Sequence, residues 1–190
     1  MKDVDGVKKA VMKPAGARWR SSAATRQRGA SLLEAIAYLG IAALVVIGAI
    51  ALLTSAFSSA NTNAVSEQIS AIQTGVKKLY SGQNASYSGL TNTVLASAGV
   101  FPASFSPASD GSVTNTWNGT VTVAVASSPD EFTITYTDVP QNVCVNAVSA
   151  GGSWMAISVN GTALTLPATP ADASADCSST SANTIVWTST

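Results

Sequence analysis

The residue best placed to take part in chemistry is Glu34, an acid at the head of an uncharged apolar run. Between Glu34 and Glu67 no side chain carries a charge, and Tyr38 supplies the only polar side chain among the 19 residues 35–53. A carboxylate there costs about 2.5 kcal/mol or more if it enters lipid unpaired. We therefore expect Glu34 to have a specific partner. The alternative is an interfacial carboxylate solvated by lipid headgroups.

Cys144 and Cys177 are the other candidates, and the lack of histidine limits what they can do. Without histidine the chain has no usual general base near neutral pH and no Ser-His or Cys-His nucleophile. Two cysteines without histidine also make a poor metal site. The adjacent carboxylates Asp130 and Glu131 would point to opposite faces of a strand, so we interpret them as a solvated turn. The sequence therefore predicts neither an enzyme nor a cofactor or metal site.

A membrane span is the first element that positions these residues. At about 1.5 Å per residue, residues 35–53 extend roughly 28 Å, close to the hydrocarbon thickness of a bilayer. Residues 1–29 carry eight Lys and Arg against two Asp, a net charge of +6, and residues 30–190 carry two Lys against eight Asp and Glu, a net charge of −6. Because positive flanks stay in the cytoplasm, we expect everything after the span to be exported. The basic leader therefore indicates membrane targeting rather than nucleic-acid binding.

Export also decides the expected state of the two cysteines. An oxidising compartment favours a disulfide between Cys144 and Cys177. That bond would close a loop of about 34 residues and contribute roughly 3 to 4 kcal/mol. Two independent buried thiols are the alternative.

The rest of the chain predicts an α+β fold, in which a long N-terminal helix packs on an antiparallel sheet. Apolar residues at helical spacing extend the helix from Ser31 to about Tyr80. They are Val65, Ile69, Ile72, Val76 and Leu79 or Tyr80. Residues 81–116 are expected to form a loop with a short helix near 90–98. Turns at Asn118-Gly119 and Asn160-Gly161 separate strands expected over 120–126, 132–136, 154–159, 162–166 and 184–188.

The order of basic leader, Gly29, small residue, Leu32-Leu33, Glu34 and apolar helix resembles the start of a type IV prepilin. The 29-residue leader is similar to that of the type IVb subclass. Ala30 stands where phenylalanine or methionine is often found, and no proline lies between Ala30 and Pro102, which departs from the type IVa helix and favours type IVb. The resemblance is close over residues 26–57 and architectural beyond them.

The resemblance implies a domain organisation and a mode of assembly. A membrane-bound prepilin peptidase would remove leader 1–29 after Gly29 and N-methylate Ala30, which leaves Glu34 as the fifth mature residue. Helix 30–57 would polymerise, and Glu34 would pair with the α-amino group of a neighbouring copy, whose ordinary pKa is about 8. The head, residues 58–190, would carry the variable region of the family between Cys144 and Cys177.

The implied function is that of a major structural subunit of a type IVb pilus, an extracellular filament for adhesion, aggregation or conjugative cell contact. Its partners would be prepilin peptidase, the inner-membrane assembly machinery, the membrane before assembly, and further copies of itself. The precursor would lie in the bacterial inner membrane with its leader cytoplasmic and its head periplasmic.

Three alternatives remain at this point. Within the class, the chain could be a minor pilin or a type II secretion pseudopilin. Outside it, the chain could be a secreted adhesin or binding domain with an ordinary signal sequence, because Ser58-Ser59-Ala60 resembles a small-residue cleavage site. The third is a membrane-anchored domain that is never cleaved.

Overall fold

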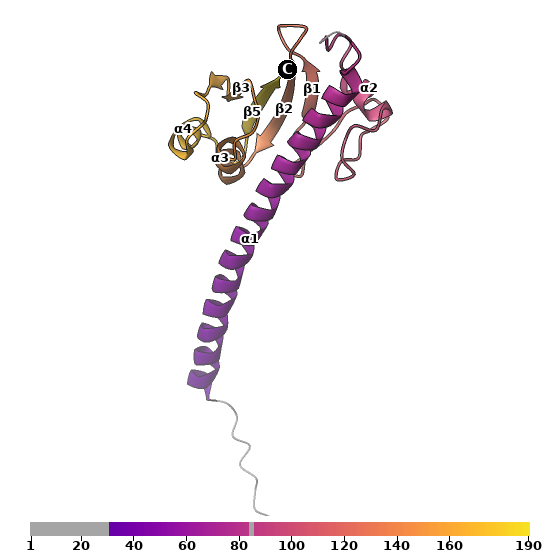
Figure 1. Cartoon of the computed structure of the whole chain (residues 1–190). Coiled ribbons are helices and arrows are strands. Elements are labelled where there is room, and N and C mark those ends of the chain that lie inside the picture. Colours follow the sequence, from indigo (N-terminus) through magenta and orange to yellow (C-terminus); the bar gives the residue numbers. More distant parts are fainter. Residues whose placement is uncertain (1–30, 84–85) are drawn as a thin grey trace, which may run out of the picture. The chain divides into compact units, whose positions relative to one another are not determined.

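The computed structural model describes residues 31–83 and 86–190, so that Gly29 and Ala30 lie outside the described residues. Two compact units are present, one ending at Val45 and the other spanning Val46–Thr190. Helix α1 (Leu32–Tyr80) contributes to both, and its 49 residues agree with the predicted continuous helix (Figure 1). At 1.5 Å per residue it is about 74 Å long.

In the first unit, the described residues 31–45 are helical from Leu32 onward, and their side chains are exposed. Leucine, isoleucine and valine dominate this segment, and the run of exposed residues continues to Thr54. By length and composition α1 is able to cross a membrane, with a window of 18 residues that has a mean hydropathy of 2.7. This apolar helix agrees with the span predicted over residues 35–53.

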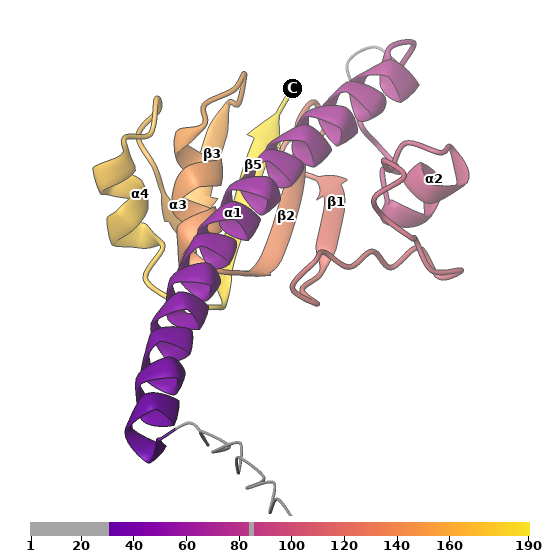
Figure 2. The ribbon, with the colours of Figure 1, turned by 90° about the horizontal axis from the view of Figure 1, so that it is seen from below.

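The second unit contains a five-stranded antiparallel sheet in the order β1-β2-β5-β3-β4. The strands are β1 (Val121–Val125), β2 (Phe132–Val139), β3 (Ala156–Val159), β4 (Thr162–Ala163) and β5 (Asn183–Ser189). The C-terminal strand β5 lies between β2 and β3, and the C-terminal part of α1 crosses one face of the sheet (Figure 2). The predicted fold class, a long helix on an antiparallel sheet, is confirmed.

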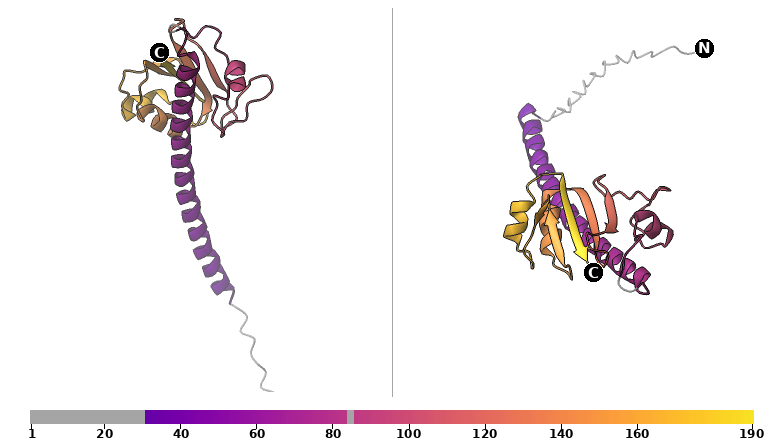
Figure 3. Two further views of the ribbon diagram at one scale, coloured as in Figure 1. Left: turned by 45° about the vertical axis from the view of Figure 1, so that its right-hand side comes forward. Right: turned by 90° about the horizontal axis from the view of Figure 1, so that it is seen from above.

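The core of this unit lies between α1 and the sheet, because both present apolar residues at their own period. Along β2 and β5 buried and half-buried residues alternate. The apolar positions predicted on α1 are buried as far as Val76, and Tyr80 rather than Leu79 completes the stripe, since Leu79 is 40% exposed. The opposite face of the sheet is turned toward the viewer on the right of Figure 3. Ala124 and Val186 are half-buried on this face, and its threonines are half-buried or exposed: Thr122, Thr133, Thr135, Thr184 and Thr188.

Three short helices complete the second unit. Helix α2 (Asn92–Ser97) occurs where the sequence predicts a short helix. Helices α3 (Gln141–Ser149) and α4 (Pro170–Asp176) interrupt a region that the sequence predicts as strands and turns. The views agree that α2 lies beyond β1, whereas α3 and α4 lie at the β3 side of the sheet (Figures 2 and 3).

The predicted turns occur, but one predicted strand is shorter than expected. Asn118 and Asn160 both have a positive φ, 67° and 51°, which asparagine tolerates better than most residues. A Cβ at Gly119 would collide with the carbonyl group of Thr137, so this close approach requires glycine. The strand expected over 162–166 reduces to β4, and the half-buried Leu164 and Leu166 beyond it pack against the core instead.

Candidate assembly site

Glu34 lies in the first turn of α1, whose start is capped by Ser31. The Ser31 hydroxyl oxygen accepts a hydrogen bond from the Glu34 N–H at 3.2 Å, and the Ser31 carbonyl accepts from Ala35 N–H at 3.0 Å. A serine followed three residues later by glutamate is a known helix-start signature. The sequence predicts a helix that begins at Ser31, but the spacing between Ser31 and Glu34 was not used there as a capping signal. The cap fixes where the helix begins and keeps Glu34 at its positive end.

The side chains that follow Glu34 form an apolar surface. Leu32 and Leu33 are 82% and 79% exposed, and leucine, isoleucine and valine side chains remain more than half exposed as far as Leu53. Monomeric soluble proteins rarely expose contiguous apolar patches larger than a few hundred Å². This part of α1 therefore needs lipid or another protein surface to cover it.

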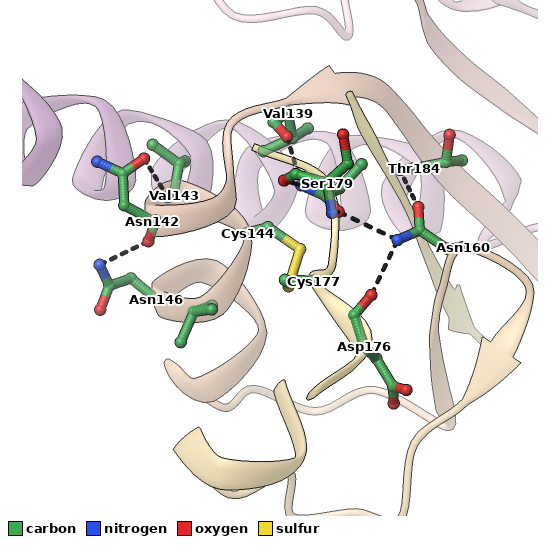
Figure 4. The surroundings of a disulfide bond; sticks show 12 residues. Val139, Asn142, Val143, Cys144, Asn146, Asn160, Asp176, Cys177, Ser179 and Thr184 are labelled. Carbon is green, nitrogen blue, oxygen red and sulfur yellow. Dashed lines mark hydrogen bonds between the residues drawn. A yellow bond between two sulfur atoms is a disulfide. The ribbon is translucent and has the colours of Figure 1, made fainter. Parts of the chain in front are cut away.

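The predicted disulfide is present and ties α3 to the end of α4 (Figure 4). Cys144 and Cys177 are fully buried, their Cα atoms are 6.0 Å apart, and 33 residues separate them in sequence. Around the bond, Val143, Ala147 and Ala173 belong to the main core. The region between the two cysteines is thus anchored at both ends rather than hanging from the sheet as a free loop.

The buried carboxamide of Asn183 joins several segments of the second unit. Its Nδ2 group donates to the carbonyl oxygens of Val139 and Ser179, at 2.9 and 2.6 Å. Its Oδ1 atom accepts from Ser179 N–H and from Asn160 Nδ2, both at 3.0 Å. All four hydrogen-bonding positions of the amide are used, which makes a buried polar side chain favourable.

Asn160 extends this network to the last residue before Cys177. Its Nδ2 group donates to the carbonyl of Asp176 at 2.8 Å, and its Oδ1 atom accepts from Thr184 N–H at 2.9 Å. The turn after β3, the start of β5 and the residue before Cys177 are therefore held together independently of the disulfide. Sequence reasoning missed Asn183, because nothing local distinguishes it from an exposed asparagine.

Polar contacts also fasten α1 to the sheet. The Tyr136 hydroxyl donates to Gln68 Oε1 at 3.3 Å, and Gln73 Nε2 donates to Ser189 Oγ at 2.8 Å. Tyr136 is fully buried, and this burial raises the pKa of its phenol above the ordinary range. These pairs orient α1 on the sheet, because they require one rotation of the helix about its axis.

The adjacent carboxylates Asp130 and Glu131 lie where the chain passes from β1 to β2. Asp130 lies in the turn between β1 and β2, where the Ser128 hydroxyl donates to it and lowers the pKa of its carboxyl group. Glu131 is half-buried and immediately precedes β2. Over residues 31–83 and 86–190, no group of three or more His, Cys, Asp or Glu side chains is arranged to hold a metal ion.

An apolar N-terminal helix and an α+β domain that contains a disulfide together define a class of protein. The family described as PilS N terminal matches residues 59–190. The chain therefore belongs to the type IV pilin family.

Known relatives agree with this assignment. The chain is 32% identical over 123 residues to the major structural subunit of bundle-forming pilus from Escherichia coli O127:H6 and from Escherichia coli O111:H-. The match covers 63% of this chain and spans 63% of the length of each relative. Among solved structures, TcpA, a type IV pilin from Vibrio cholerae El Tor biotype, matches with a TM-score of 0.50 at 13% identity, over 68% of this chain and 99% of that chain. That likeness concerns the fold.

Proposed function

We propose that this chain is the precursor of a major structural subunit of a type IVb pilus and that it has no catalytic role. The observation that carries the proposal is the apolar face of α1 behind Glu34, which has no partner within the part of the chain that the structure describes. The family assignment and the relatives that are pilus subunits support it.

In this proposal, prepilin peptidase cleaves after Gly29 and creates an α-amino group on Ala30. A charged amine and the Glu34 carboxylate of a neighbouring copy neutralise each other within an apolar bundle of helices. Ser31 contributes by fixing the start of α1. The pairing sets the axial register, since a copy inserted out of register would leave both charges unpaired in an apolar surrounding.

The head is the part displayed on the outside of the filament. Residues 58–190 contain two Lys against seven Asp and Glu, and the face of the sheet turned away from α1 is rich in threonine. Adhesion, aggregation and conjugative contact are all compatible with such a surface. The precursor is expected in the inner membrane, where the assembly machinery takes it up, before it leaves as part of an extracellular pilus.

Mass spectrometry of the mature N-terminus tests the proposal against the alternatives. We expect a chain that begins at Ala30, with or without an added methyl group. A chain beginning near Asn61 would instead identify a secreted domain with an ordinary signal peptide. A chain that still begins at Met1 would identify an uncleaved membrane anchor, and either result overturns the proposed processing.

A further inference from the structure

Strand β1 forms one outer edge of the sheet, and three of its outward main-chain groups, at Val121 and Val123, are bonded to other parts of the chain. Because Thr122 and Ala124 pair with β2 through their main chain, Val121, Val123 and Val125 direct their N–H and C=O groups away from the sheet. An unpaired edge of this kind is a template for a strand from another chain. The Val121 N–H is already bonded to the Val113 carbonyl at 2.8 Å.

The carboxamide of Asn92 occupies the next two groups of this edge. Asn92 Nδ2 donates to the Val121 carbonyl at 2.7 Å, and Asn92 Oδ1 accepts from Val123 N–H at 2.8 Å. One side-chain amide thus offers the same donor and acceptor that a peptide group of an adjacent strand would offer. Asn92 is the first residue of α2, and α2 lies on the side of β1 away from β2 in Figure 2.

The surroundings hold Asn92 in this position. Thr91 caps α2 by accepting a hydrogen bond from Val94 N–H at 3.3 Å, and the fully buried Leu95 anchors the same turn in the core. On the outer side, Thr93 packs so closely on Gly111 that a Cβ at residue 111 would collide with the Thr93 backbone. Asn92 is therefore placed by the helix that carries it rather than by its own two bonds.

We propose that Asn92 closes the β1 edge between Val121 and Val123, and so hinders β1 of one copy from pairing along its full length with β1 of another. The need follows from the proposed function, since subunits that are crowded together must pack through the intended surfaces and not through strand addition. The inference itself rests on the edge geometry and does not depend on processing at Gly29. Its partner is a second copy of this chain, which β1 would bind if the carboxamide were removed.

The test compares the full-length chain in detergent micelles with its Asn92→Ala variant. In dilute protein, exchange of the Val123 amide hydrogen should become about fivefold to tenfold faster, the factor that corresponds to the net contribution of one hydrogen bond. A second experiment uses concentrated protein in which every chain also carries Thr122→Cys, an exposed position on β1. A bismaleimide reagent then links the introduced cysteine side chains of two chains whose β1 strands lie next to each other. We expect several times more covalent dimer with Asn92→Ala than without it.

Asn146→Ala is the matched control, because Asn146 Nδ2 donates to the Asn142 carbonyl within α3 at 2.7 Å, and α3 lies at the β3 side of the sheet, away from β1 (Figure 2). It should change neither the Val123 amide nor the yield of dimer. Equal dimer yields from Asn92→Ala and the control would overturn the proposal.

Asn92→Asp separates closure of the edge from a general role in folding. The carboxylate keeps an acceptor for Val123 N–H but cannot donate to the Val121 carbonyl. The Val123 amide should therefore stay protected, and the yield of dimer should lie between those of the wild type and Asn92→Ala. If both variants instead lose protection throughout β5 together with Val123, Asn92 holds the fold rather than the edge, and the proposal is wrong. Such a result would leave the mature N-terminus at Ala30 unaffected, so the two proposals fail separately.

Discussion

Removing the Cys144–Cys177 bond should destabilise the head by an amount that its sequence separation sets. The bond joins residues 33 apart and closes a loop of about 34 residues. For a loop of this length, the chain-entropy model gives a stabilisation of roughly 3 to 4 kcal/mol at 25 °C. Since the free energy of unfolding of a domain of this size is about 5 to 15 kcal/mol, the loss is a large share of its stability.

The structure also predicts where the loss is felt first. The Asn183 and Asn160 amides hold the start of β5 and the turn after β3 without help from the disulfide. Asn160 bonds only the last residue of helix α4, Asp176, and Ala173 is the buried residue of this helix. Hydrogen exchange should therefore accelerate in α4 before it does at Thr184.

The assay uses a soluble chain of residues 58–190, which should fold as a monomer because the buried stripe of α1 begins at Val65. Urea unfolding of the oxidised form is compared with the reduced form and with a Cys144→Ala, Cys177→Ala double variant. The free energy of unfolding of the reduced form and of the double variant should each be about 3 to 4 kcal/mol lower than that of the oxidised form. Agreement between them shows that the loss comes from the cross-link rather than from the thiols that reduction creates.

Two results would refute this reasoning. An unchanged midpoint after reduction would show that the bond has no structural role. Simultaneous loss of protection in α4 and at Thr184 would show that the amide network depends on the disulfide.

Three further outcomes are expected. Gly29→Val should leave an unprocessed membrane precursor and no filaments, whereas Gly6→Val in the same leader should be cleaved normally; immunoblotting of cell fractions distinguishes them. Glu34→Gln should be cleaved but should enter filaments at least about tenfold less well, since a charged hydrogen bond contributes about 1.5 to 3 kcal/mol; Glu67→Gln, an exposed acid on the same helix, is the control, and equal pilus yields would contradict the pairing. Tyr136→Phe should cost about 1 kcal/mol at pH 7, because Gln68 loses its donor. Burial raises the pKa of Tyr136 in the folded state above its unfolded value of about 10. The protonated phenol therefore contributes to the free energy of unfolding below about pH 10, and this contribution is lost as the pH rises above that value. Between pH 7 and pH 11 the Tyr136→Phe variant should therefore lose less stability than the wild type.

The sequence alone determined the elements whose cause is local or periodic. The apolar run after Glu34 and the stripe from Val65 to Val76 are properties of spacing along one helix, and the structure contains that helix from Leu32 to Tyr80. The strands with regular alternation and the asparagine-glycine turns were predictable for the same reason. Export of both cysteines made their pairing the natural expectation.

Helices α3 and α4 were not predicted, for two different reasons. Helix α3 is a short segment rich in valine and asparagine, whose intrinsic preference for a helix is weak; burial of Val143, Cys144 and Ala147 decides its conformation. Helix α4 has a local signal that was overlooked, since Thr169 caps it and Pro170 follows at its first position.

The roles of Asn183 and Asn92 depend entirely on tertiary structure. Each carboxamide bonds main-chain groups far away in sequence: Asn183 reaches back 44 residues to Val139, and Asn92 reaches forward 29 residues to Val121. The strand order also depends on tertiary structure, because β5, the last strand in the sequence, lies between β2 and β3. Local patterns determine which segments become helices and strands, whereas burial and hydrogen bonding between distant segments decide which neighbours they find.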